Sequence, residues 1–249
     1  MKRAFPRLLL LFAAALLLLA GCTEGEAAQL REGRRLMRAY LAEHGIKAGL
    51  SDSHADVLRP DASVLVLSDY VWGSFRQDGE KYDLAVNVVT GEIYTSERME
   101  EFTRYCVAAL TERLELDPSN CVGYCWIFLE VPTWHNGNPD WPANEYRSFR
   151  DMLPADIADM EAYAVQAVTS EEIELWAELV CRNEELSEER WSLADTKGWD
   201  NTSVTVYALD EPGAELPNPK EFFYRDKHDF SGTVVRLEEQ EVSYQRVSP

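Results

Sequence analysis

Hydrophobic side chains open the chain in one unbroken run. Residues Leu8 to Leu19 are all leucine, phenylalanine or alanine. Three basic residues, Lys2, Arg3 and Arg7, come before this run. A helix needs about 20 apolar residues to cross the hydrocarbon core of a bilayer, so this run is too short to span it. A basic leader followed by a short apolar run is typical of an export signal.

After residue 29, the apolar positions recur at the spacing of a helix. Leu30, Met37, Leu41 and His44 fall on one stripe, which predicts a helix with one buried face. Gly45 follows the stripe directly. Because glycine adopts the left-handed backbone that often ends a helix, we expect the helix to end there.

The pattern then changes to one that predicts three strands. Residues 64–75 hold an apolar and aromatic run, and Asp78-Gly79 after it is a strong hairpin signal. Residues 82–89 supply the second strand, and Thr90-Gly91 turns the chain into a third at residues 92–94. We expect these strands to form an antiparallel meander.

A second helix and a buried strand follow the meander. Ser96 is a typical N-terminal cap, and Asp117-Pro118 predicts the end of the helix. Residues 121–131 are apolar at almost every position, which predicts a central strand covered on both faces. The buried stripe of the helix is expected to contain Met99, Phe102, Cys106, Ala109, Leu110 and Leu114.

The second half of the chain favours a similar order of elements. Residues 163–168 are expected to form a strand. Thr169 and Glu172 have the spacing of a capping box, and Ile173, Trp176, Leu179 and Val180 after them fit the stripe of a helix. Further elements are expected at the following places: a short helix after Ser187, a strand at residues 202–209 and a hairpin at residues 232–237 and 241–247.

Two segments of the chain resemble each other 74 residues apart. Residues 93–97 and 167–171 share the ending Thr-Ser-Glu, and each is expected to lead into a helix and then a strand. An internal duplication is one interpretation. The other is that a strand, a capped helix and a second strand follow one another in many α+β proteins. Strands and helices without regular alternation predict an α+β fold with a largely antiparallel sheet.

The residues that end the first apolar run carry a resemblance. The sequence Leu19-Ala20-Gly21-Cys22 resembles the lipobox of bacterial lipoproteins at all four positions. The resemblance implies that the Cys22 thiol receives a diacylglycerol, that the chain is cut before Cys22, and that the protein is held at the extracytoplasmic face of the cell membrane. It covers residues 1–22 only.

This resemblance sets the expected organisation of the chain. It implies a signal peptide at residues 1–21 and a lipidated tether at residues 22–29, which reaches at most about 25 Å from the lipid. The remainder is expected to fold as two α+β subdomains, 30–132 and 133–249, or as one domain over 30–249.

The charge of the chain limits its partners. The formal net charge is −20, and removal of residues 1–21 takes away three basic residues and no acidic one, which leaves −23. Nucleic acid and anionic lipid headgroups attract basic segments, so both are expected to repel this chain. We therefore expect no nucleic-acid partner, and a membrane contact that depends on the lipid at Cys22.

Four cysteines follow Cys22: Cys106, Cys121, Cys125 and Cys181. An even number in an exported protein permits two disulfides in three connectivities. In a strand, Cys121 and Cys125 lie about 13 Å apart and cannot bond to each other. Cys106, on the helical stripe, could reach one of them. The alternative is that all four are buried thiols.

Motifs for catalysis and for metal binding are weak. No Gly-x-Ser-x-Gly elbow, phosphate-binding glycine loop or His-Glu-x-x-His motif occurs in the sequence. If residues 52–56 are extended, Asp52, His54 and Asp56 share one face, but polar segments of this kind are common. We therefore predict no metal site and no cofactor.

The most unusual segment is a polar and aromatic loop after the central strand. Its aromatic rings and hydrogen-bonding groups suit a glycan or a peptide, and a long structureless loop is often functional. The alternative is that its tryptophans pack against the edge of the core. The candidate binding residues are Trp134, His135, Asn136, Asp140, Trp141 and Tyr146.

Three functions are consistent with these patterns. The preferred one is a non-enzymatic lipoprotein that binds a glycan, a peptide or a protein of the cell envelope. The second is an envelope hydrolase that uses His135 with Asp140 or Glu145. The third is a structural or chaperone-like subunit.

Overall fold

A computed structural model describes most of the chain beyond residue 24. Contact density divides the chain into two compact units. Of the described residues, unit 1 contains those up to Ser96 together with Pro132, and unit 2 contains those in 97–131 and 146–249. The predicted subdomains at 30–132 and 133–249 stay a prediction. The described residues are 25–57, 67–132, 146–170, 173–182, 201–209, 214–224, 232–238 and 241–247.

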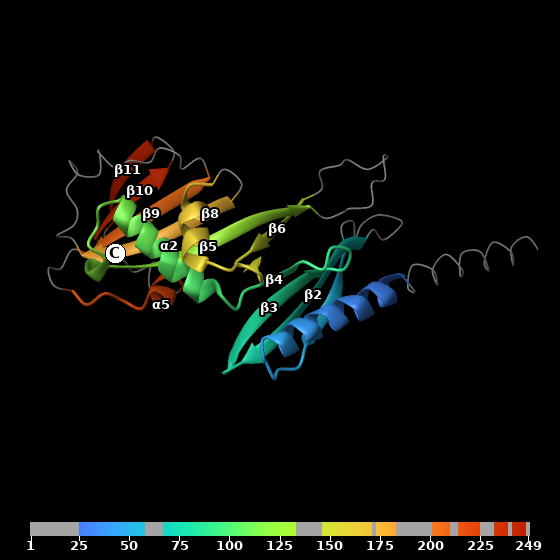
Figure 1. Ribbon diagram of the computed structural model, residues 1–249. Coiled ribbons are helices and arrows are strands. Elements are labelled where there is room, and N and C mark those ends of the chain that lie inside the picture. The colour runs from blue at the N-terminus through green and yellow to red at the C-terminus, as the bar shows by residue number, and fades with distance from the viewer. Residues whose placement is uncertain are drawn as a thin grey trace, which may run out of the picture. The chain divides into compact units, whose positions relative to one another are not determined.

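Unit 1 packs one helix on an antiparallel sheet (Figure 1). Residues 25–43 are helical. In the sheet, β2 pairs with β1 and with β3, and β3 pairs with β4. The predicted meander is therefore confirmed as β2 to β4, while the strand β1 was not predicted. The strands are β1 (Ser51–Val57), β2 (Leu67–Gln77), β3 (Glu80–Asn87) and β4 (Ile93–Thr95).

Two glycines bring the helix close to β2. A Cβ added at Gly33 would lie 2.5 Å from the Val71 Cβ, and one added at Gly73 would lie 2.8 Å from the Met37 sulfur. Met37 and Leu41 are buried, as the stripe predicted, and Tyr40 is buried beside them. The helix therefore lies nearly against the backbone of the sheet.

The helix differs from its prediction at both ends. Five residues of the expected tether, 25–29, are already helical, so a helical rise of about 1.5 Å per residue shortens the reach of that segment. His44 lies beyond the last helical residue and is exposed rather than buried. Its Nδ1 is 2.9 Å from the Tyr40 carbonyl oxygen, and the two rings are 4.2 Å apart.

We expect Gly33→Ala to destabilise unit 1 by about 1–2 kcal/mol, as overpacking outweighs the helix propensity that alanine gains. The added methyl would meet three carbons of the stiff Val71 side chain at 2.5–2.7 Å. Gly49→Ala is the matched control, because its added methyl meets nothing within 4 Å. Urea unfolding of the two variants measures the difference, and equal midpoints would contradict the close packing.

Unit 2 is built on a six-stranded sheet in the order β11-β10-β9-β8-β5-β6. β11 with β10, β10 with β9 and β8 with β5 pair antiparallel, whereas β8 with β9 is parallel. The largely antiparallel α+β fold is therefore confirmed. The strands are β5 (Cys121–Pro132), β6 (Tyr146–Arg150), β8 (Ile173–Arg182), β9 (Thr202–Leu209), β10 (Gly232–Glu238) and β11 (Glu241–Val247).

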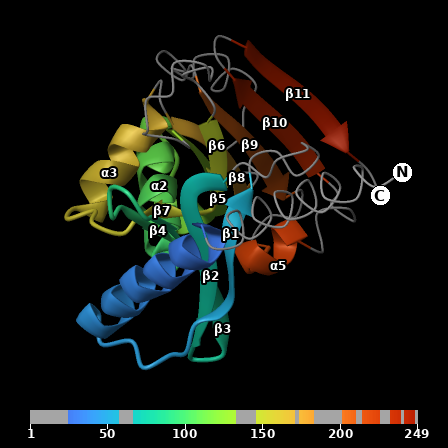
Figure 2. The same cartoon turned by 90° about the vertical axis from the view of Figure 1, so that its right-hand side faces the viewer.

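Helices cover both faces of this sheet. Figure 2 shows α2 (Met99–Arg113) and α3 (Met160–Val168) on one side of it and α5 (Pro219–Tyr224) on the other. We call the α2 and α3 side the inner face and the α5 side the outer face. The turn η1 (Pro118–Asn120) leads from α2 into β5, and the short strand β7 (Leu153–Pro154) follows β6.

The inner face holds the core that the sequence predicted for α2. Met99, Phe102, Cys106 and Leu110 are buried there, and the central position of β5 is confirmed. The predicted cap is wrong. The Ser96 hydroxyl accepts a hydrogen bond from the Asp83 backbone N–H at 2.9 Å, whereas α2 begins at Met99 without a side-chain cap.

The predictions for residues 163–180 are wrong in element type. Residues 163–168 belong to the helix α3, whose cap is the Asp159 side chain, which accepts from the Ala162 N–H at 3.0 Å. Residues 173–180 belong to the strand β8 and not to a helix. The segment from residue 93 contains a strand, a helix and a strand (β4, α2 and β5), whereas the later segment contains a helix and then a strand (α3 and β8). The predicted duplication is therefore contradicted. The expected helix after Ser187 falls outside the described residues.

Candidate functional site

The predicted binding loop falls largely outside the described part of the chain. Trp134, His135, Asn136, Asp140 and Trp141 belong to residues 133–145, which the structure does not describe. Tyr146 begins β6, but its side chain is not described either. The loop and the hydrolase that would use it therefore stay predictions, and so does the lipid on Cys22.

The outer face of the unit 2 sheet carries an aromatic row, and none of its residues is among the binding residues predicted from the sequence. Tyr124, Trp126 and Phe128 alternate along β5 with the buried inner-face residues. Trp176 on the neighbouring β8 stands directly across from Trp126 in the register. The aromatic row therefore crosses two adjacent strands in the interior of the sheet.

The helix α5 covers one part of this row. Phe222 and Phe223 are buried against Val180 and Val234. The Phe223 ring lies 6.1 Å from the Trp126 ring, and the Phe222 ring lies 5.4 Å from the Tyr207 ring. Edge-to-face contacts of this kind add to the stability that burial provides.

The other part of the row remains open. Trp176 is 51% exposed, although it lies on an interior strand, and its ring is 5.5 Å from the Phe128 ring. The Arg150 guanidinium lies 5.8 Å from the centre of the Phe128 ring. Glu174 is exposed and stands directly across from Phe128 in the register. We call Phe128, Arg150, Glu174 and Trp176 the Trp176 surface.

A charged neighbour fixes one edge of the Trp176 surface, at Arg150. The Arg150 Nε lies 3.3 Å from the Asp151 carboxylate, and the Asp151 N–H donates to the Ile127 carbonyl at 2.9 Å. Burial raises the pKa of Asp151, against the opposing effect of Arg150. These contacts tie the start of the turn after β6 to the central strand and so position Arg150 beside Phe128.

A tyrosine–carboxylate pair lies further along the outer face. The Tyr207 hydroxyl donates to the Glu178 carboxylate at 3.4 Å. Burial and the Glu178 charge raise the pKa of Tyr207 to about 12, so the hydroxyl stays protonated at neutral pH and keeps its role as donor.

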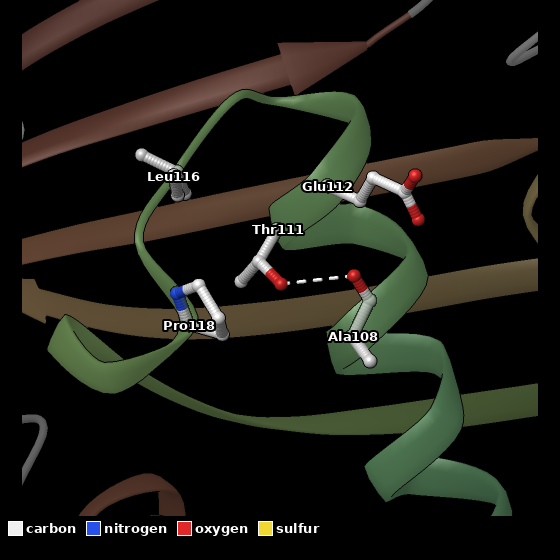
Figure 3. Close-up of a pocket in the computed structure, with 5 residues that line it drawn as sticks. All are labelled: Ala108, Thr111, Glu112, Leu116 and Pro118. Carbon is white, nitrogen blue, oxygen red and sulfur yellow. Dashed lines mark hydrogen bonds between the residues drawn. The ribbon is translucent and has the colours of Figure 1, made fainter.

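A separate hollow lies at the C-terminal end of α2 (Figure 3). It has a volume of about 380 Å³ and is lined by Ala108, Thr111, Glu112, Leu116 and Pro118. The Thr111 hydroxyl donates to the Ala108 carbonyl at 2.9 Å, so its proton is committed to the helix backbone. Among these described lining residues, only Glu112 adds a charged group.

The polar segment around His54 forms the strand β1 but does not gather ligands. Asp52 adopts a left-handed backbone with φ of +52°, and the register shifts between Ser51 and His54. The three side chains therefore do not alternate along a regular strand. In the described part of the chain, no group of three or more histidine, cysteine, aspartate or glutamate residues could hold a metal ion.

The four cysteines of the predicted disulfides all lie in the core of unit 2. Cys106 is on α2, Cys121 and Cys125 are on β5, and Cys181 is on β8. All four are buried, and none of these described cysteines is in a disulfide in the structure. Whether the protein forms disulfides when it is exported stays a prediction.

Trp176 is the residue whose environment differs most from its prediction. The helical spacing predicts it on a buried stripe, whereas it is an exposed residue of a strand. The signal that could have found it is the alternation of Ile173, Leu175, Ala177 and Leu179, which are all buried on the inner face. Trp176 falls between these positions and so faces outward.

Within the described residues, no helix combines the length and the apolar character needed to cross a membrane. The sequence matches no known protein family, no curated protein and no solved structure.

Proposed function

We propose that the protein is a lipid-anchored binding module of the bacterial cell envelope, and that it binds a protein partner through the Trp176 surface. The anchor in this proposal is a diacylglycerol on Cys22, for which the lipobox-like Leu19–Cys22 segment is the support. The observation that carries the binding role is the 51% exposure of Trp176 on an interior strand. Burial of a large exposed aromatic side chain against a partner is favourable, and exposed apolar surface of this kind marks interaction sites.

The residue types of the Trp176 surface favour a protein partner. Tryptophan and arginine are enriched among the residues that contribute most to protein–protein binding. Here Trp176 and Phe128 offer ring faces, and Arg150 and Glu174 can form charged hydrogen bonds at their edge. Because the proposed mature chain carries a net charge of −23, a partner segment with basic residues would approach it fastest.

The rigidity of the surface also supports binding. Trp176 and Phe128 lie on paired strands, and Arg150 is held by the ion pair with Asp151. Side chains that are already ordered lose less entropy when a partner binds.

A photo-crosslinking amino acid placed at Glu174 tests this proposal in living cells. We expect an adduct of one discrete mass, because the probe would lie beside a bound partner. Trp176→Ala in the same chain should weaken the adduct about 30-fold, which corresponds to the 2 kcal/mol or more that a central aromatic residue contributes.

The matched control places the same probe at Val165, which is 53% exposed on α3 at the inner side of the same unit. Equal adducts from both positions, or an adduct at Glu174 that survives Trp176→Ala, would contradict the proposed surface. An adduct that yields no peptide of a second protein, and whose added mass a glycosidase removes, would replace the protein partner by a glycan.

A further inference from the structure

The pairing of β5 with β8 brings two cysteines together. Cys121 and Cys181 are direct partners in the antiparallel register. Directly opposed residues in such a ladder point to the same face of the sheet, with Cα atoms about 4.5–5.5 Å apart. Disulfides form at Cα separations of about 4.4–6.8 Å. The register alone therefore gives this pair the separation of a cross-strand disulfide.

The packing of α2 on the inner face brings the other two together. Cys106 comes from the buried stripe of α2, and the Cys125 side chain lies within hydrogen-bonding reach of its thiol. Both side chains are fully buried, so no solvent separates them. A disulfide between them would bring the two sulfur atoms to the bonded distance of about 2.05 Å.

The same register excludes the other two connectivities. Cys121 and Cys125 are four residues apart on one strand, about 13 Å, and cannot bond to each other. Cys125 stands opposite Ala177, so Cys181 is also four positions away from it along the ladder. Each alternative connectivity requires one of these two distant pairs. Only Cys106 with Cys125 and Cys121 with Cys181 remains.

We propose that the exported protein contains two disulfides, Cys106–Cys125 and Cys121–Cys181. The inference rests on the proposed envelope location, because the cytosol keeps thiols reduced. Each bond forms when two thiols lose two protons and two electrons. The electron acceptor is the disulfide of an oxidised thiol–disulfide oxidoreductase, which becomes a dithiol through a mixed disulfide.

Burial decides when these bonds form and what they do. At most 6% of any of the four side chains is exposed, so an oxidoreductase reaches them only before α2 packs on the sheet. Burial also raises the pKa of the Cys106 thiol well above its usual range, so a Cys106 thiol in the folded chain would be a poor nucleophile. These features suit structural disulfides rather than a catalytic or metal-binding cysteine.

The two disulfides would strengthen the scaffold of the Trp176 surface. One joins β5 to β8 and the other joins β5 to α2, so β5 becomes the centre of a covalent network. Phe128 and Trp176 project from these same two strands on the opposite face. The disulfides would therefore fix the strands that carry the aromatic rings.

Mass spectrometry of the full-length protein tests the pairing. Whole cells are lysed in denaturant with N-ethylmaleimide, which blocks any thiol, and the purified chain is cut with trypsin without reduction. Trypsin leaves Cys121 and Cys125 on one peptide, 114–147, because no lysine or arginine lies between them. We expect that peptide to be linked both to 105–113 and to 151–182, with no maleimide on any of the four cysteines.

Two paired variants assign the individual bonds. Cys106→Ala with Cys125→Ala should leave peptide 114–147 linked to 151–182 alone. Cys121→Ala with Cys181→Ala should leave it linked to 105–113 alone. Maleimide on all four cysteines of the natural chain, or loss of the surviving link in either variant, would overturn the proposal.

The N-terminal peptide in the same spectra separates this proposal from the proposed function. Lipidated Cys22 together with four blocked thiols would overturn the disulfides and leave the anchor intact. Both links on a chain without lipid at Cys22 would support the disulfides and overturn the anchor.

Discussion

Replacement of residues 1–21 by an ordinary cleavable export signal, together with Cys22→Ser, will release the exported protein from the membrane. We expect the membrane-bound fraction to fall about tenfold or more, because stable anchoring requires two acyl chains and serine receives none. The mature chain offers no electrostatic substitute, since its charge of −23 opposes contact with anionic headgroups. Centrifugation of lysed cells, followed by quantitation of pellet and supernatant, measures this fraction.

The control for this experiment keeps the natural signal and carries Val165→Ser. That residue is 53% exposed on α3, far along the chain from the lipobox, so its substitution should leave the membrane fraction unchanged. A chain with Cys22→Ser that still sediments with the membranes would show that another part of the protein holds it there.

The second large effect is expected at the contact between α2 and α3. Phe102→Ala should destabilise unit 2 by about 3–5 kcal/mol, because it removes a fully buried ring and leaves a cavity. The Phe102 ring lies 5.9 Å from the Tyr163 ring, so the substitution also removes the aromatic contact between the two helices. Chemical denaturation of the purified protein measures the loss.

Tyr105→Ala is the matched control on the same helix. Tyr105 is only partly buried, and the guanidinium of the exposed residue Arg104 lies 4.9 Å from the centre of its ring. Its truncation should therefore cost about 1 kcal/mol, as is usual outside the core. Equal losses for the two variants would mean that α3 does not cover Phe102 in the folded protein.

The parts of the fold that the sequence predicted are those whose pattern allows one interpretation. The stripe from Met99 to Leu110 fits a helix and no strand, and residues 121–131 are too apolar for an edge strand. Residues 173–180 fit both periods, because Ile173, Trp176 and Leu179 are spaced like a helix while Ile173, Leu175 and Ala177 alternate like a strand. The register with β5, which is not a local property, decides in favour of the strand.

The same limit applies to the candidate site and to the cysteines. Trp176 is exposed because it lies on the outward side of a strand. The wrong prediction of a helix placed it among the buried residues instead. The sequence excluded a bond between Cys121 and Cys125 from strand geometry alone, but it could not place Cys181 opposite Cys121. That requires knowledge of which strands pair and in which register, and β5 and β8 are separated by some 40 residues of chain.

The most direct test of the proposed anchor is the mass of the N-terminal peptide of the protein isolated from its own cells. We predict that the chain begins at Cys22 and that this residue carries the mass of a diacylglycerol. A chain that begins at Met1, or one that begins at Cys22 or another residue without added lipid, would contradict it.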